Sequence, residues 1–364
     1  MNHKGDDGDD AAREDAGDCR ATRPVIILTG VTASGKSRLA MTLAQRFEGV
    51  IINADSMQVY HDLPILTAQP TPEDQVALPH ALYGVVKARK EGPGGGTKNE
   101  TGGGSVGGTG GGSVGGMGGG SVGWWVTRAR AQIKNAHQRG QVPFITGGTM
   151  MYARALMAGL SPIPPVDDAV RAAARARFAA VGHEAFARAL IARDPAGGAV
   201  ATDPQRLIRA YEVLEATGKP LRHWQTQVHR PPCCWRFIVV IVQLLPAAQI
   251  TAATMRLEAM LAGGMLDEVA RAGIDPACPL AKAHGLREFR AYLAGELTRA
   301  VAIQRTVDAM KTYSKRQRTW LRNHLPGPAE ACAQAVSWLH WPADQDFARV
   351  GDWLAPQIKK IRSS

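Results

Sequence analysis

Residues 30–37 read Gly-Val-Thr-Ala-Ser-Gly-Lys-Ser and match the phosphate-binding pattern G-x-x-x-x-G-K-S/T. The apolar run of residues 24–29 comes directly before them, and a stretch of helical composition follows as far as Phe47. A glycine-rich loop between a buried strand and a helix turns backbone N–H groups toward an anion, and the helix dipole favours the negative charge. This context predicts a P-loop that binds a diphosphate or a triphosphate. It leaves open which of the two binds and whether a phosphoryl group is what the protein transfers.

Three further apolar runs predict buried strands, at residues 50–55, 142–146 and 237–245. Segments of helical composition separate them, which is typical of a parallel sheet with helices on its faces. We therefore expect an α/β fold: a P-loop NTPase-like parallel sheet core with an inserted all-helical domain and C-terminal helices.

Composition along the chain predicts the domain boundaries. Residues 92–123 repeat the unit Gly-Gly-Gly-Ser-Val-Gly-Gly-X and hold much of the excess among the 40 glycines of the chain. Such a polar repeat is expected to be a flexible insertion, because it cannot bury a core. The predicted divisions are a disordered acidic tail (1–22), a P-loop core (23–160), a helical insert (161–235), a segment that completes the core and adds C-terminal helices (236–325) and a C-terminal tail (326–364).

The chain is basic, with a formal net charge of +11, although acidic residues crowd its first twenty positions. A basic body suggests a polyanionic partner. No apolar run reaches 18 residues and the N-terminus has no hydrophobic signal region, so neither a membrane span nor secretion is expected. The five cysteines show no C-x-x-C spacing, which argues against a zinc site and fits a reducing cytosol. We expect a cytoplasmic protein that acts as a monomer.

Asp55 is predicted to close the second strand at the carboxyl edge of the sheet, where open α/β sheets place their ligands. A carboxylate beside a P-loop is able to ligate Mg²⁺, act as a general base or cap a helix, and the residues alone do not favour one of these roles. Gly147, Gly148 and Thr149 end the third strand at the same edge. The two glycines indicate either a close approach of backbone to a ligand or a plain turn.

Several segments in a fixed order resemble one family. N-A-D-S-M-Q-V-Y begins at Asn53, T-A-Q-P at Thr67, G-G-T-M-M-Y at Gly147, D-P-Q-R-L-I-R-A at Asp203 and K-R-Q-R-T-W-L-R at Lys315. Together with the P-loop as G-x-T-A-S-G-K-S, they resemble the tRNA dimethylallyltransferase (tRNA isopentenyltransferase) family over residues 24–325. Each segment is only modestly specific, whereas their order and spacing are highly specific together.

The resemblance implies a prenyl transfer that depends on Mg²⁺. Such an enzyme moves a dimethylallyl group from dimethylallyl diphosphate to N6 of the adenine 3′-adjacent to the anticodon of a tRNA, and diphosphate leaves. The P-loop would then hold a leaving group, and Asp55 would accept the N6 proton. The target adenine would be flipped out of the anticodon stack into a channel.

The resemblance also assigns roles to residues. The implied catalytic residues are Asp55, Thr149 and Lys36. The implied diphosphate-binding residues are Gly30, Val31, Thr32, Ala33, Ser34, Gly35, Lys36, Ser37 and Arg256, with the Ser37 hydroxyl also facing Mg²⁺. The implied tRNA-binding residues are Asp55, Ser56, Met57, Gln58, Arg171, Gln205, Arg206, Leu207, Ile208 and Arg209.

Three positions depart from the family pattern. Gln69 stands in place of a cation, Ala252 in place of an arginine one turn before Arg256, and Leu286 in place of an aromatic residue.

The residues by themselves also allow a P-loop kinase of a small metabolite, in which Asp55 would hold Mg²⁺ or the substrate. A third interpretation is a non-enzymatic RNA-binding protein, against which the intact Gly35-Lys36-Ser37 argues.

The cationic segment of residues 311–322 contains Tyr313 and Trp320. Cations interleaved with aromatic side chains suit an RNA backbone and unstacked bases. A solvated basic surface is the alternative for this segment.

Overall fold

The computed structural model describes residues 23–88, 120–195, 203–227, 235–276, 278–324, 337–342 and 346–362. The predicted acidic tail (1–22) and most of the predicted glycine-rich insertion (92–123) lie outside these residues.

In the described part of the chain, six parallel strands form one sheet in the order β3-β2-β4-β1-β5-β6. The strands are β1 (Arg23–Gly30), β2 (Gly49–Asn53), β3 (His80–Ala81), β4 (Val142–Thr146), β5 (Trp235–Gln243) and β6 (Ser337–Pro342). The predicted parallel α/β class is therefore confirmed. Because β4 lies between β2 and β1, the loops that follow these three strands meet at one edge of the sheet.

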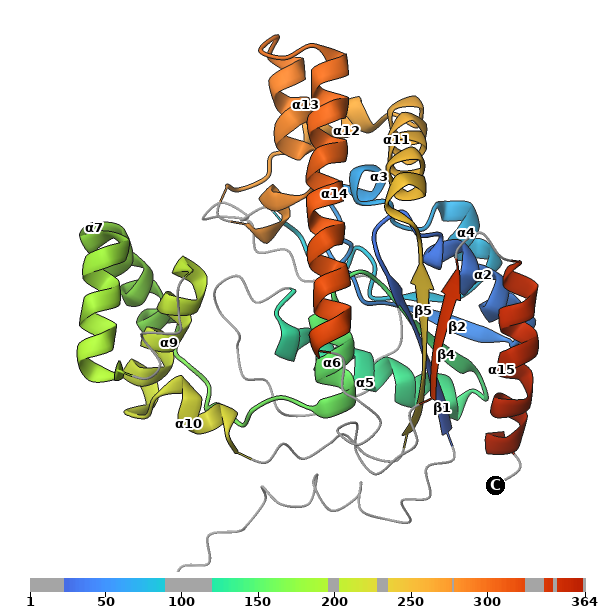
Figure 1. The fold of residues 1–364 in the computed structure, drawn as a ribbon, viewed down its shortest axis with the longest axis horizontal. Coiled ribbons are helices and arrows are strands. Elements are labelled where there is room, and N and C mark those ends of the chain that lie inside the picture. Colours follow the sequence, from blue (N-terminus) through green and yellow to red (C-terminus); the bar gives the residue numbers. More distant parts are fainter. Residues whose placement is uncertain are drawn as a thin grey trace, which may run out of the picture. The chain divides into compact units, whose positions relative to one another are not determined.

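The helices and the 3-10 turn are distributed along the chain between and after the strands (Figure 1). They are α2 (Lys36–Arg46), α3 (Pro64–Thr67), α4 (Pro72–Ala77), α5 (Val122–Gln138), α6 (Met150–Ala158), α7 (Asp168–Arg193), α9 (Pro204–Thr217), α10 (Leu221–Gln225), α11 (Pro246–Ala262), α12 (Met265–Arg271), η2 (Pro279–Lys282), α13 (Leu286–Leu293), α14 (Arg299–His324) and α15 (Phe347–Arg362).

The strand side chains divide the core into two layers by the period of two that a strand imposes. Ile26 and Leu28 of β1 face α2 and α15, whereas Val25 and Ile27 face the layer that contains α5 and α6. Burial on both faces explains why the strands read as continuous apolar runs.

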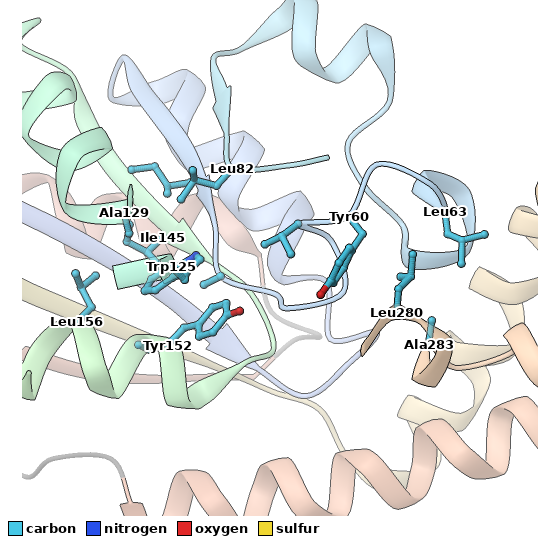
Figure 2. Packing of buried hydrophobic residues seen from close by; sticks show 14 of the residues in the cluster. Tyr60, Leu63, Leu82, Trp125, Ala129, Ile145, Tyr152, Leu156, Leu280 and Ala283 are labelled. Carbon is cyan, nitrogen blue, oxygen red and sulfur yellow. The ribbon is translucent and has the colours of Figure 1, made fainter. Parts of the chain in front are cut away.

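In the second layer, the rings of Trp125 and Tyr152 lie against each other (Figure 2). They are stacked, and their centroids are 4.6 Å apart. The Trp125 indole N–H donates to the carbonyl of Asn53 at 2.6 Å. This buried hydrogen bond secures the end of β2, from which the chain enters the candidate site.

The segment after residue 325 differs from the predicted tail. It contains β6, which extends the sheet beyond β5, and α15, which packs on the α2 side. Phe347 of α15 lies under the P-loop, since a Cβ on Gly35 would be 3.4 Å from its ring. The prediction was wrong here because residues 337–342, with two tryptophans, a histidine and a proline, show no apolar run of the kind that identified the central strands.

The chain divides into two compact units, and residues 159–230 belong to the smaller one. Its core is built by α7 and α9, with Phe186, Leu190 and Leu207 fully buried. Trp235, the last residue of the predicted insert (161–235), begins β5 of the larger unit.

Candidate active site

The P-loop connects β1 to α2, and its backbone takes the conformations that its small residues permit. Gly35 has φ of 83° and Ala33 has φ of 62°, both in the left-handed region. Gly30 has a second constraint, because a Cβ there would lie 2.4 Å from the carbonyl oxygen of Val242 in β5. The loop is therefore held close to the neighbouring strand, with α2 starting at its C-terminal end.

Lys36 is nearly buried, and its ammonium donates to the carbonyl of Val31 at 3.2 Å. Burial, together with the nearby Arg256 guanidinium, lowers the pKa of Lys36 to about 8, while the Asp55 carboxylate acts in the opposite direction. Two cations close together in a desolvated place are unfavourable by themselves. They are stabilised when an anion binds between them.

Among the cavities that the described residues form at this edge of the sheet, two contain P-loop residues, and each has a volume suited to a small ligand or part of one. The P-loop cavity, of about 530 Å³, is lined by Ser34–Arg38 and by residues of the β2–β3 region. The Asp55 cavity, of about 250 Å³, is lined by Asp55, Ser56 and the inner face of α14. Lys36 and Arg256 line both cavities, so the two meet at the pair of cations.

Asp55 lies two residues beyond the end of β2, so the predicted strand (50–55) ends earlier than expected. Its N–H donates to Asn53 Oδ1 at 2.7 Å, and its own Oδ1 accepts from the N–H of Met57 at 2.9 Å. A turn follows, and no helix starts at Asp55, so the helix-cap role considered for this residue is wrong. These bonds fix the carboxylate on the wall of the Asp55 cavity.

Gly147 and Gly148 permit a close approach that other residues would block. A Cβ on Gly147 would lie 2.1 Å from the carbonyl carbon of Ala54, and one on Gly148 would lie 3.2 Å from Asp55 Oδ2. The two glycines therefore let the β4 loop pack directly against the backbone and carboxylate of the β2 loop. The close neighbour is protein, and the approach of this backbone to a ligand stays a prediction.

Thr149 forms two hydrogen bonds with Ser56. Its Oγ1 accepts from the Ser56 N–H at 2.9 Å and donates to Ser56 Oγ at 3.2 Å. Ser56 and Met57 line the Asp55 cavity, and Thr149 lies behind Ser56. Thr149 is not a wall residue of this cavity, so the catalytic role that the resemblance implies for it stays a prediction.

Gln58 and Gln69 both use their amide groups to hold main-chain carbonyls. Gln58 Nε2 donates to the carbonyls of Thr67 and Ala68, each at 2.8 Å. Gln69 Nε2 donates to the Tyr60 carbonyl at 2.7 Å. Both residues lie on the P-loop cavity, so the departure at Gln69 leaves a neutral, fixed amide where the family pattern has a cation.

Arg256 of α11 is half-buried. Burial lowers the pKa of its guanidinium, and the Asp55 carboxylate raises it. Ala252, one turn earlier, also lines the P-loop cavity. With alanine at that position, α11 contributes Arg256 alone as a cation to this wall.

The sequence did not identify the inner face of α14 as part of the site. Met310, Tyr313 and Gln317 line the Asp55 cavity, and their spacing of three and four residues places them on one face. The Tyr313 ring lies 5.1 Å from the ring of His284. Burial and the Asp55 carboxylate raise the pKa of Tyr313 to about 12. The sequence does place these three side chains on one face of a helix. Helical spacing alone does not show which loops or cavity that face contacts.

Two main-chain N–H groups of the P-loop already have acceptors within the protein. The N–H of Thr32 donates to Gln317 Oε1 at 3.0 Å, and that of Ser34 donates to the carbonyl of Val31 at 3.3 Å. The N–H groups of Ala33, Gly35, Lys36 and Ser37 are therefore the candidates for an anion, and the diphosphate contact implied for Thr32 stays a prediction.

The implied tRNA-binding residues of the insert fall into two groups. Gln205, Arg206 and Arg209 have side chains that reach the surface of the smaller unit, and Arg206 forms an ion pair with Asp203 while Arg209 forms one with Glu212. Leu207 is fully buried, and Ile208 packs against the same cluster. Leu207 and Ile208 form the apolar stripe of an amphipathic helix, so the contact with tRNA implied for them stays a prediction.

Arg171, the remaining implied tRNA residue, is half-buried in α7. Its Nε is buried without a hydrogen-bond partner among the described residues. The contact of Arg171 with tRNA that the resemblance implies stays a prediction.

The residues of the P-loop cavity fit a magnesium ion bound through phosphate. Ser37 is exposed on this cavity, and Thr146 Oγ1 and Ser34 Oγ are buried there without partners among the residues described. Within that same part of the chain, no group of three His, Cys, Asp or Glu residues is placed to hold a metal. Mg²⁺ prefers oxygen ligands, keeps several waters and is commonly bound by one or two protein groups plus substrate phosphates.

A P-loop and a carboxylate on adjoining cavity walls, at the carboxyl edge of a parallel sheet, define a P-loop α/β enzyme. The family model described as IPP transferase matches residues 119–324. The tRNA dimethylallyltransferase of Rhodospirillum centenum is 39% identical over 84% of this chain and 90% of the relative. That of Gluconacetobacter diazotrophicus is 41% identical over 85% of this chain and 86% of the relative. The chain belongs to the IPP transferase family.

Solved structures agree in fold. A structure of a eukaryotic dimethylallyltransferase acting on tRNA matches with a TM-score of 0.71 and 21% identity, over 94% of this chain and 80% of that one. The tRNA isopentenylpyrophosphate transferase of Bacillus halodurans matches with a TM-score of 0.57 and 24% identity, over 94% and 98%. The family favours a prenyltransferase over a small-metabolite kinase. Among the helices described here, none is long and apolar enough to cross a membrane.

Proposed function

We propose that this protein transfers a dimethylallyl group from dimethylallyl diphosphate to N6 of the adenine 3′-adjacent to the anticodon in tRNA. One observation carries the proposal: the P-loop cavity and the Asp55 cavity share Lys36 and Arg256 as a common wall. A diphosphate between these cations would present its prenyl carbon to the cavity that holds the carboxylate.

The reaction breaks the bond between the prenyl C1 and the diphosphate oxygen and forms a bond between C1 and adenine N6. Asp55 accepts the proton that N6 loses, because its carboxylate faces the Asp55 cavity and is oriented by the Met57 N–H. Lys36 and Arg256 stabilise the negative charge that builds on the departing diphosphate. The Ser37 hydroxyl is the protein ligand available to Mg²⁺, which when bound would neutralise part of that charge.

The Asp55 cavity suits a purine ring. Tyr313 and His284 both line it, with their ring centroids 5.1 Å apart, and a cavity of about 250 Å³ is large enough for a base but not for a whole nucleotide. Single bases removed from their stack commonly lie against aromatic side chains.

We propose that the protein works in the cytoplasm, as a monomer.

A direct test incubates the protein with unmodified tRNA, dimethylallyl diphosphate and Mg²⁺, then analyses the nucleosides by mass spectrometry. We expect N6-prenylated adenosine. A matched tRNA with guanine in place of the target adenine should give none. Prenylation elsewhere in both tRNAs, or none in either, would contradict the proposed substrate.

We further expect the Arg206→Ala/Arg209→Ala double variant to bind tRNA more weakly without a change in affinity for dimethylallyl diphosphate. The two arginines lie on the insert, whereas the P-loop belongs to the larger unit. Binding of a cation to a phosphate releases counterions, so the slope of log K against log salt should become shallower by about 0.7–0.9 for each phosphate that is no longer neutralised. The measurement is tRNA binding across a salt series.

Arg193→Ala is the matched control for this pair, since Arg193 also lies on the insert and also forms an ion pair, with Glu215. If the double variant and the unchanged protein bind tRNA with equal affinity at every salt concentration, Arg206 and Arg209 do not contact tRNA and are solvated surface charges.

A further inference from the structure

Gln317 connects two loops that lie far apart in the sequence. Its side chain is 3% exposed and comes from the C-terminal half of α14. Its Oε1 accepts from the Thr32 N–H at 3.0 Å, and its Nε2 donates to the Gly148 carbonyl at 3.0 Å. One amide group therefore joins the start of the P-loop to the loop after β4.

The orientation of this amide follows from its partners. A backbone N–H only donates and a carbonyl only accepts, so the oxygen of Gln317 must face Thr32 and its nitrogen must face Gly148. A flipped amide would bring donor against donor and acceptor against acceptor. Both loops are thus held at a set distance from the same side chain.

The two loops carry the two halves of the proposed chemistry. Thr32 lies in the P-loop four residues before Lys36. Gly148 borders the carboxylate, because a Cβ added there would lie 3.2 Å from Asp55 Oδ2 and 2.8 Å from Gln317 Nε2. The position of Gln317 therefore affects the separation between the diphosphate site and the proton acceptor.

The placement of α14 itself does not depend on Gln317. Its Ser314 is hydrogen-bonded to Gln249 of α11, and Arg318 donates to the Oε1 of the same Gln249 at 3.1 Å. Apolar side chains such as Met310 and Val307 add packing on the same helix. Removal of the Gln317 amide should consequently leave the helix docked while releasing the two loops.

We propose that Gln317 is a positioning residue that sets the spacing between the P-loop and the Asp55 carboxylate for prenyl transfer. The inference rests on the proposed function. In-line transfer requires the prenyl carbon and N6 at near-contact distance, and a misplacement of about 1 Å costs up to about 10²-fold in rate. Substrate binding depends on other groups, namely Lys36, Arg256 and the remaining N–H groups of the P-loop.

The test compares Gln317→Met, which keeps the length of the side chain but forms neither bond, with Gln304→Met. Gln304 is exposed on the same helix and bonded to Asp308, so it controls for the same substitution away from the site. We expect kcat of Gln317→Met to fall by at least about tenfold, with KM for tRNA and the equilibrium affinity for dimethylallyl diphosphate each within about threefold. The control should retain its kcat.

Gln317→Asn keeps the amide on a side chain one methylene shorter, and it should show the same decrease because it cannot reach both loops. If Gln317→Met does not fold, judged by its thermal melting curve, Gln317→Asn decides the matter. A kcat near that of the unchanged protein, or a decrease in diphosphate affinity as large as the decrease in kcat, overturns the proposal. Failure of the proposed function would look different, since the unchanged protein itself would then prenylate no tRNA.

Discussion

Replacing Asp55 with asparagine is expected to lower kcat by about 10²–10⁴-fold, the usual cost of losing a general base. Asparagine has nearly the same shape, and its carbonyl oxygen is able to accept the Met57 N–H that Asp55 Oδ1 now accepts. The loop geometry should therefore survive while the proton acceptor disappears. Affinity for dimethylallyl diphosphate should change little, because Lys36 and Arg256 remain.

The measurement is steady-state prenyl transfer together with equilibrium binding of dimethylallyl diphosphate. Asp62→Asn is the matched control, since the Asp62 carboxylate also accepts a backbone N–H, that of Ala88, and is not a wall residue of the Asp55 cavity. The control should transfer at the normal rate. Turnover of Asp55→Asn within a few fold of the unchanged protein would rule out the general-base role.

Lys36→Met is expected to weaken the binding of dimethylallyl diphosphate by about 10–100-fold, which corresponds to one hydrogen bond to a charged group. The ammonium is nearly buried at the junction of the two cavities, where water screens it poorly. Arg256 retains part of the attraction, so binding should be weakened and not abolished. Affinity equal to that of the unchanged protein would place the diphosphate elsewhere.

The pKa of Lys36 predicts that the affinity for dimethylallyl diphosphate depends on pH. In the free protein the pKa of Lys36 is about 8, so the amine loses its charge above that pH. Bound diphosphate favours the charged form and raises this pKa, so binding takes up a proton. Affinity should then fall as pH rises above about 8, by up to about tenfold per unit until the pKa of the complex is reached. Below about pH 7 the amine is charged in both states, and it contributes no dependence.

Lys36→Arg separates this effect from ionisation of the ligand, since a guanidinium keeps its charge across the whole range. The measurement is the dissociation constant of dimethylallyl diphosphate between about pH 6.5 and about 9.5 for both proteins. A parallel decline in both would show that a group other than Lys36 is responsible.

The parts of the site that could be predicted from the sequence are those in which a local pattern has a local consequence. The P-loop follows from glycines and a lysine between a strand and a helix, and Asp55 follows from a carboxylate at the end of an apolar run. Both lie at the same sheet edge because parallel strands bring their carboxyl ends together. The α/β class was predictable for the same reason.

The parts that could not be predicted depend on contacts between distant segments. Gln317 meets Thr32 across 285 residues and Gly148 across 169 residues. No spacing within α14 indicates such partners. The burial of Leu207 could not be predicted for a related reason, since the segment that resembles a tRNA-binding helix also has to bury one face in its own unit. The edge strand β6 was missed because an edge position does not require a continuous apolar run.

Whether the P-loop holds a leaving diphosphate, with no phosphoryl group transferred, is tested most directly by the stoichiometry of a single reaction. The protein is incubated with tRNA, dimethylallyl diphosphate and Mg²⁺ in the absence of any nucleoside triphosphate, and diphosphate and N6-prenylated adenosine are both quantified. We predict one diphosphate released for each prenylated adenosine, with neither product formed by Asp55→Asn at a comparable rate. Diphosphate release without prenylated adenosine, or activity that requires a nucleoside triphosphate and yields a phosphorylated product, would contradict this mechanism.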